Sequence, residues 1–384
     1  MSYPIRKTEY YNYNAPIAHS SHVKVLKRKP KKRKKNFIAL FVSLVLLSLY
    51  AYYICPYNYN HYLRPLFINR ILNKDLNLNV KGYISPTLNY LYTSNFLGEN
   101  IRTQSVEKSK QIADIQILNE MSSTKQKLLD LFKTHPELQP AVFVWEYSTG
   151  SGFEINSNEI YPSASIIKIP IAYELIRLVD RTSKTPFPVS LKDNRKFSEF
   201  FRTSGSGDLQ KTRANVYYSL DYLANIMIAN SDNSATNMIL YEIGGIDNFN
   251  RAMRNLGLKH VSMGNWLPDL EGTNKITAYE ISKILYNIDN PNYINPKYKN
   301  ILKEYLGNTK NIHLIKEKLP PDVMVLHKTG DIGTMLGDSG IVYTNNGKKY
   351  IVTILVKRPH NAYSARTAIQ DASKIIFEDI KNLP

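Results

Sequence analysis

A run of 19 residues without a charged side chain, Phe37–Cys55, restricts the topology of this chain more than any other feature. A stretch of this length and apolar character is long enough to cross a bilayer as a helix. Tyrosines gather at its far end, as in the aromatic belt at a membrane interface. The run directly follows residues 1–36, which hold eleven Lys and Arg against Glu9 alone. We therefore expect a single transmembrane anchor at 37–55.

The basic segment sets the expected orientation of this anchor. By the positive-inside rule, residues 1–36 form a cytoplasmic tail and everything after Cys55 lies outside the cell membrane. A nucleic-acid-binding role for the basic cluster and a cleaved signal peptide are the alternatives. The adjoining apolar run argues against the first, and the long polar tail argues against the second. Cys55 is interpreted as an interface residue rather than a lipidation site.

The composition excludes several classes of protein. With 384 residues, of which 43% are hydrophobic and 21% charged, the chain is long and apolar enough to bury a proper core. A single cysteine rules out a disulfide framework and a cysteine-based metal site. The histidines show no paired ligand spacing except His19 and His22, which lie in the polar tail, and the chain has no glycine-rich phosphate loop. We expect no metal, no cofactor and no nucleic acid partner.

The pattern of apolar residues places strands at both ends of the exported part and helices between them. A hairpin is indicated where alternation from Val142 to Glu146 meets a Ser-Thr-Gly turn and Phe153–Ile155. Three further strands are predicted at Val323–His327, Ser339–Thr344 and Tyr350–Lys357, followed by a helix. The predicted fold is α/β (α+β), with one antiparallel sheet formed by both ends of residues 121–384 and covered by helices. Residues 56–120 are interpreted as a spacer.

Three short motifs occur in order along this domain. Ser165 and Lys168 stand three residues apart at the start of an apolar helix, so the hydroxyl and the amine share a face. Ser231-Asp232-Asn233 lies between two helical stretches, and Lys328-Thr329-Gly330 ends the strand Val323–His327. Taken singly, each is better explained as a helix cap, a solvated lysine or a turn. Because all three occur in this order and at this spacing, together they favour a common functional site.

Together the three motifs resemble the S-x-x-K, S-D-N and K-T-G set of the class A β-lactamases and penicillin-binding proteins. The resemblance covers roughly residues 120–384 and implies a serine hydrolase of the β-lactamase/transpeptidase-like fold. It implies Ser165 as the nucleophile, Lys168 as its base and Ser231 as the relay of a proton to the leaving nitrogen. Asn233 would orient the substrate amide and Lys168.

The same resemblance implies the substrate-binding residues. Lys328 and Thr329 would hold the substrate carboxylate, and Gly330 would let the ligand lie close along the strand. The backbone N–H groups of Ser165 and Asp331 would form the oxyanion hole. The carboxylate of Asp331, beside an anionic substrate, departs from the family pattern.

The deacylating glutamate of the class A W-E-P-E-L-N loop is missing. The matching stretch, Asn265–Glu271, has Leu267 at the glutamate position and Glu271 at the asparagine position. Either Glu271, counted here as a catalytic residue, or Asp269 could replace the missing base, which gives a working β-lactamase that opens β-lactam amides. The alternatives are a penicillin-binding-type D,D-carboxypeptidase or esterase acting on D-Ala-D-Ala peptides, and a non-hydrolytic β-lactam or peptidoglycan sensor.

Overall fold

The computed structural model describes residues 111–183, 188–290 and 294–384. The strands are β1 (Asn119–Glu120), β2 (Gln139–Glu146), β3 (Ser151–Ile155), β4 (Tyr161–Pro162), β5 (Asn194–Lys196), β6 (Tyr217–Ser219), β7 (Lys275–Ile276), β8 (Met324–Asp331), β9 (Met335–Tyr343) and β10 (Lys349–Lys357). The α-helices are α5 (Ser122–Lys133), α6 (Lys168–Thr182), α7 (Leu220–Ala229), α8 (Asn233–Glu242), α9 (Gly245–Asn255), α10 (Ala278–Asp289), α11 (Pro296–Gly307) and α12 (Ser364–Lys381). Three short 3-10 helices are η4 (Ala164–Ile167), η5 (Glu199–Phe201) and η6 (Leu209–Lys211).

Six strands form the main sheet in the order β1-β3-β2-β10-β9-β8. The predicted hairpin is β2–β3, and the three predicted C-terminal strands are β8, β9 and β10, so strands from both ends of the domain share one sheet. Pairing is antiparallel throughout except between β1 and β3, which run parallel. Since β8 is the last strand in the order, one of its edges is not paired with another strand of this sheet.

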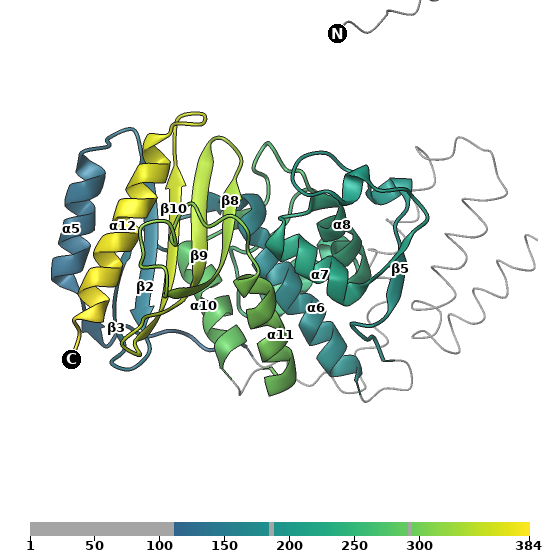
Figure 1. Cartoon of the computed structure of the whole chain (residues 1–384), viewed down its shortest axis with the longest axis horizontal. Helices are drawn as coiled ribbons and strands as arrows, with labels where there is room; N and C mark the ends of the chain where they lie inside the picture. Colours follow the sequence, from purple (N-terminus) through teal and green to yellow (C-terminus); the bar gives the residue numbers. More distant parts are fainter. Residues whose placement is uncertain (1–110, 184–187, 291–293) are drawn as a thin grey trace, which may run out of the picture. The chain divides into compact units, whose positions relative to one another are not determined.

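Both faces of the sheet are buried, because side chains alternate along each strand. On β10, Ile351 and Leu355 enter the core shared with the central helices, whereas Val352 and Ile354 enter a second core. Helices α5 and α12 cover the second face, and α6, α10 and α11 are among those on the first (Figure 1). The result is a layered α/β domain of the predicted class.

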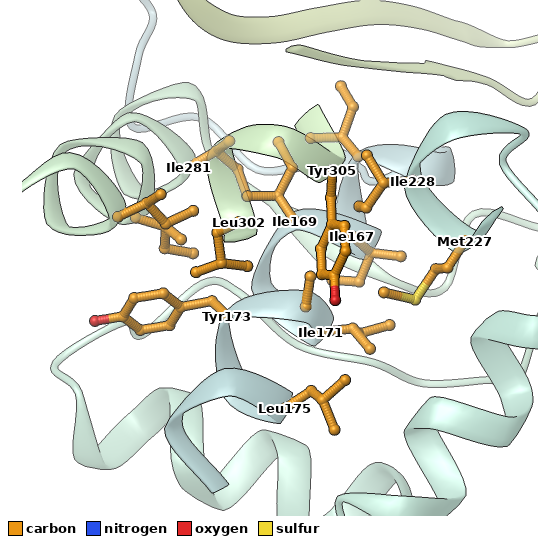
Figure 2. Close-up of a cluster of buried hydrophobic side chains, with 14 of the residues drawn as sticks. Ile167, Ile169, Ile171, Tyr173, Leu175, Met227, Ile228, Ile281, Leu302 and Tyr305 are labelled. Atoms are coloured by element: carbon orange, nitrogen blue, oxygen red, sulfur yellow. The ribbon is translucent and has the colours of Figure 1, made fainter. Parts of the chain in front are cut away.

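Helix α6 lies at the centre of the helical layer and is buried on almost all sides. Its side chains Ile169, Ile171 and Leu175 pack among residues of α7, α10 and α11, such as Met227 and Leu302 (Figure 2). A helix that is apolar around most of its circumference is stable only inside a core. This packing gives the first residue of α6, Lys168, a fixed position with almost no access to water.

Residues that precede the expected boundary at 121 also pack in the core of the domain. Ile112 and Ile115 are buried, and the Asn287 side chain bonds both backbone polar groups of Ala113. The predicted tail, anchor and most of the spacer, residues 1–110, lie outside the described residues. None of the helices within the described ranges is long and apolar enough to cross a membrane.

Candidate active site

The serine of the first motif lies in a 3-10 turn, not in the α-helix that the spacing predicts. Ser165 is the second residue of η4, and α6 begins only at Lys168. The Lys168 side chain is completely buried, and its Nζ lies 2.9 Å from Ser165 Oγ. The three-residue spacing therefore does bring the hydroxyl and the amine together. Ala164, directly before the serine, has a positive φ of 43°, which is uncommon for a residue other than glycine.

The second motif reaches the same amine from the turn between α7 and α8. Lys168 Nζ lies 2.7 Å from the Ser231 carbonyl, 2.9 Å from Ser231 Oγ and 2.9 Å from Asn233 Oδ1. Ser231 also has a positive φ, 56°. Backbone conformations of this kind cluster at functional sites, where the surrounding structure holds them in place. One lysine thus joins two serine hydroxyls through hydrogen bonds.

The environment of Lys168 favours its uncharged form. Burial lowers the pKa of the Lys168 amine well below its ordinary value, and the positive charge of Lys328 lowers it further; the Asp232 carboxylate opposes both effects. An uncharged amine has a free electron pair that can accept the proton of a neighbouring hydroxyl. The geometry is therefore that of a nucleophile beside its base.

The third motif lies inside β8 rather than at the end of a strand, because β8 continues to Asp331. Lys328 is almost fully buried, and its Nζ donates to the Thr329 carbonyl at 2.9 Å. Burial lowers the pKa of Lys328 to about 8, against the opposing effect of the Asp338 carboxylate. Its other N–H bonds are available to a ligand in the cleft that Lys328 lines.

Neighbouring side chains leave little space for a Cβ atom at Gly330. A Cβ atom at this position would lie 3.0 Å from Ile166 Cγ1 and 3.1 Å from Ala164 Cβ. A side chain at this position would therefore push β8 and the turn that carries Ser165 apart by a few tenths of an ångström. This close approach to η4 is a second reason for glycine, beside the predicted approach of a ligand along the strand.

Asp331 lies at the end of β8, and its charge is paired. Its carboxylate bonds Arg358 Nη2 at 2.5 Å and accepts the Gly333 N–H at 2.8 Å. The Ile332 N–H donates to the Met335 carbonyl, and N–H groups alternate in direction along an antiparallel strand. The Asp331 N–H therefore points to the open edge of the sheet, as an oxyanion donor requires.

A cleft of about 380 Å³ brings these segments together. Of the predicted site residues, Ser165, Ser231, Lys328, Thr329 and Asp331 line it, while Lys168 and Asn233 lie behind the two serines. The remaining lining residues are Ser206, Gly207, Asp208, Ala229, Asn230, Thr309, Lys310 and Asn311. Sequence reasoning missed Thr309, Lys310 and Asn311, which carry no motif.

The family model described as the beta-lactamase enzyme family matches residues 123–380, more than half of the chain. The chain belongs to the beta-lactamase enzyme family. This confirms the resemblance seen in the three motifs and makes the protein a class A β-lactamase-like hydrolase.

Individual relatives are distant. The β-lactamase of Streptomyces albus G is 24% identical over 252 residues, covering 62% of this chain and 79% of the relative. The β-lactamase ROB-1 of Haemophilus influenzae is 24% identical over 275 residues, covering 67% and 85%. Among solved structures, PBP-A is 27% identical with a TM-score of 0.66, covering 71% of this chain and 100% of PBP-A. A leucine-to-glutamate mutant of PBP-A was solved as an acyl-enzyme complex with penicillin G. It is 26% identical to this chain with a TM-score of 0.66, and the coverage is again 71% of this chain and 100% of PBP-A.

The loop that would carry a deacylating base, Asn265–Glu271, has two carboxylates, those of Asp269 and Glu271, and neither is among the residues that line the cleft. Both backbone polar groups of Leu267 bond the side chain of Asn237. The Asp269 carboxylate is buried and accepts hydrogen bonds from the Thr273 N–H, the Thr273 hydroxyl and the Asn274 N–H. Glu271 is exposed.

Asp232, the central residue of the second motif, is a structural residue. Its carboxylate caps α8 by accepting the Ala235 N–H at 2.8 Å and holds η6 by accepting the Leu209 N–H at 2.8 Å. A Cβ at Gly207 would lie 2.2 Å from Asp232 Oδ2, so glycine is required there. Asp232 thereby fixes the wall of the cleft opposite β8.

Proposed function

We propose that this protein is a penicillin-binding-type serine acyl hydrolase, whose Ser165 forms a long-lived acyl-enzyme with β-lactams. Its proposed natural donors are peptides or esters of the D-Ala-D-Ala class. One observation carries the proposal: Lys168 Nζ, fully buried, lies 2.9 Å from both Ser165 Oγ and Ser231 Oγ.

Acylation follows from this arrangement. Uncharged Lys168 takes the proton of Ser165 as Oγ attacks the carbonyl carbon of the donor. The N–H groups of Ser165 and Asp331 stabilise the negative charge on the carbonyl oxygen. Ser231 then gives its proton to the departing nitrogen and regains one from Lys168. The C–N bond breaks, and an ester on Ser165 remains.

The donor is positioned by groups on both sides of the cleft. The Lys328 ammonium and Thr329 bind the carboxylate of a β-lactam or of a C-terminal D-alanine, since charge-assisted hydrogen bonds are the strongest available there. Asn233 bonds Lys168 through Oδ1, and its Nδ2 donates to the Ser204 carbonyl. This fixes Asn233 between the catalytic amine and the loop that borders the cleft.

Slow release of the acyl group follows from the carboxylates near the cleft. Leu267 cannot activate water, and Asp269 is engaged by its own loop. The two carboxylates that line the cleft, Asp208 and Asp331, form ion pairs with Lys211 and Arg358. The likeness to PBP-A, over all of that chain, supports the penicillin-binding assignment.

A β-lactamase with rapid turnover and Glu271 as the base is the second candidate. It is favoured by the relatives named β-lactamases. A chromogenic cephalosporin separates the two. We expect a burst of one equivalent per enzyme followed by a slow steady rate, and release of D-alanine from a D-Ala-D-Ala peptide. Many rapid turnovers without a burst would establish the second candidate, and Ser165→Ala should abolish both signals.

We further propose that residues 37–55 anchor the enzyme in the cell membrane, with the hydrolase domain outside. The support is the charge-free run and the eleven cations that precede it. Added protease should remove the domain from intact protoplasts and leave the anchor in the membrane fraction. A domain protected in intact protoplasts but cleaved after lysis would contradict this orientation.

A further inference from the structure

A buried pair of side chains lies behind β8 on the face away from Lys328. His327 Nδ1 lies 2.9 and 3.0 Å from the two oxygens of the Asp338 carboxylate. The exposed fraction is 2% for the His327 side chain and 0% for that of Asp338. Asp338 also accepts the Ile315 N–H at 3.1 Å. Among the described residues, no lysine or arginine pairs with this carboxylate.

The pair is directly connected to the cleft through the backbone. His327 precedes Lys328 on β8, and Asp338 is the cross-strand partner of Thr329 on β9. The Thr309 hydroxyl donates to the His327 carbonyl at 2.5 Å, which ties the strand to the segment lining the cleft. A charge on a carboxylate buried in this way acts through a medium of low dielectric constant, where electrostatic interactions are stronger than in water.

Two buried lysines, Lys328 in the lining of the cleft and Lys168 behind the two serines, have opposite tasks in the proposed reaction. Lys168 must be uncharged to act as a base, whereas Lys328 must be charged to bind a carboxylate. Two ammonium groups in one buried site repel each other, so the site as a whole titrates as a coupled pair. A buried negative charge that acts on Lys328 more than on Lys168 would favour the proton on Lys328.

We propose that Asp338, held by His327, is a positioning residue that keeps the positive charge of the cleft on Lys328 and leaves Lys168 as the uncharged base. This inference depends on the proposed acylation of Ser165. The pKa data agree with it: the Asp338 charge raises the pKa of Lys328, and the Lys328 charge lowers that of Lys168. The other charged groups around the cleft are Asp232, Asp208 with Lys211, Asp331 with Arg358, and Lys310.

The test is the pH dependence of the second-order rate of acylation by a penicillin, measured on the full chain. Asp338→Asn keeps the shape of the side chain and one acceptor oxygen, and it removes the charge. We expect the alkaline limb to move down by about one pH unit, a roughly tenfold loss of rate above that limb. The acid limb, which reports Lys168, should move up by a smaller amount, because a Lys328 that carries less positive charge lowers the pKa of Lys168 less.

The matched control is Asp289→Asn. Asp289 is equally buried and bonds Lys303 and Lys349 away from the cleft, so its loss removes a buried charge without touching Lys328. Its pH profile should superimpose on that of the wild type. An Asp338→Asn profile that also superimposes would overturn the inference, whereas a wild type that penicillin does not acylate would overturn the proposed function instead.

A second pair of variants covers the case in which Asp338→Asn does not fold. His327→Gln keeps a donor for Asp338 and should preserve the alkaline limb. His327→Leu removes the donor that holds the Asp338 carboxylate in place, so the alkaline limb should move down as in Asp338→Asn. Identical profiles for these two variants would contradict a role through charge.

Discussion

Asn237 holds Leu267 by both backbone polar groups: its Nδ2 donates to the Leu267 carbonyl at 2.7 Å, and its Oδ1 accepts the Leu267 N–H at 3.1 Å. Asn237 stands one turn after Asn233 on α8, and the Asn233 side chain accepts a hydrogen bond from Lys168. The position that carries glutamate in class A enzymes is thus fixed to the helix that carries Asn233, but here it has an alkyl side chain.

Leu267→Glu should therefore accelerate deacylation. A carboxylate on this fixed backbone can act as a general base toward water, which contributes about 10²-fold or more. Leu267→Gln, with the same shape and no charge, is the control and should keep the slow release. The measurement is the decay of the penicilloyl enzyme after removal of free penicillin. Equal decay rates in the two variants would show that the position does not reach the ester.

Glu271→Gln should leave the deacylation rate unchanged within about twofold, since loss of a solvated carboxylate outside the cleft removes no catalytic group. Glu271 is exposed and does not line the cleft. Steady-state hydrolysis of a chromogenic cephalosporin checks this. A variant that acylates normally but loses its steady rate would instead identify Glu271 as the base.

Acylation should have a bell-shaped pH profile. It should fall at low pH, where Lys168 gains a proton and stops acting as a base, and the lowered pKa of Lys168 places this limb well below the ordinary value for lysine. It should fall again above about pH 8, where Lys328 loses the charge that binds the donor carboxylate. Lys328→Arg keeps its charge at any such pH, so in that variant the alkaline limb should disappear.

From the sequence we could predict which residues form the site, but not most of the contacts that hold them in place. The residue types and order of Ser165, Lys168, Ser231 and Lys328 predicted a common site because each motif is local and keeps its spacing. The partners of Asp338 and Asn237 were missed, because His327 and Leu267 are 11 and 30 residues away and no periodic pattern links them. Contacts of this kind depend on strand register and loop closure, which short motifs do not encode.

In the fold, too, some elements could be predicted from local sequence patterns and others could not. Alternation from Val142 to Glu146 predicted β2, since it reports burial on one or both faces of a strand. The end of β8 was placed too early because Lys328 and Thr329 are polar, yet both are buried within the strand. Polar residues inside a strand are expected at functional sites, where burial is maintained by the surrounding structure.

Gly330→Ala should slow acylation by about 10²-fold without unfolding the protein, because displacement of Ser165 by a fraction of an ångström to 1 Å disturbs the attack geometry. The added Cβ would crowd Ile166 and Ala164. Gly307→Ala is the control, since its Cβ would meet only the end of the Leu326 side chain at 3.2 Å. Acylation rates and thermal unfolding of both variants give the comparison, and equal acylation rates would contradict the packing argument.

Asp232→Ala should lower the free energy of unfolding by about 1–2 kcal/mol through loss of a helix cap. It should also slow acylation, because the Leu209 N–H and the wall of the cleft lose their anchor. Ser219→Ala removes the cap of α7, where Ser219 accepts the Tyr222 N–H, and should cost similar stability with normal acylation. Denaturant titration and acylation kinetics, measured on both variants, distinguish the two effects. Equal acylation rates in the two variants would show that Asp232 does not shape the cleft.

The most direct test of the account is intact-mass spectrometry of the protein after a pulse of penicillin, followed over hours and combined with peptide mapping. The account predicts one penicilloyl group per chain, located on Ser165, persisting after free penicillin is removed and absent from the Ser165→Ala variant. A folded wild-type protein that gains no adduct, or an adduct that also forms on Ser165→Ala, would contradict it.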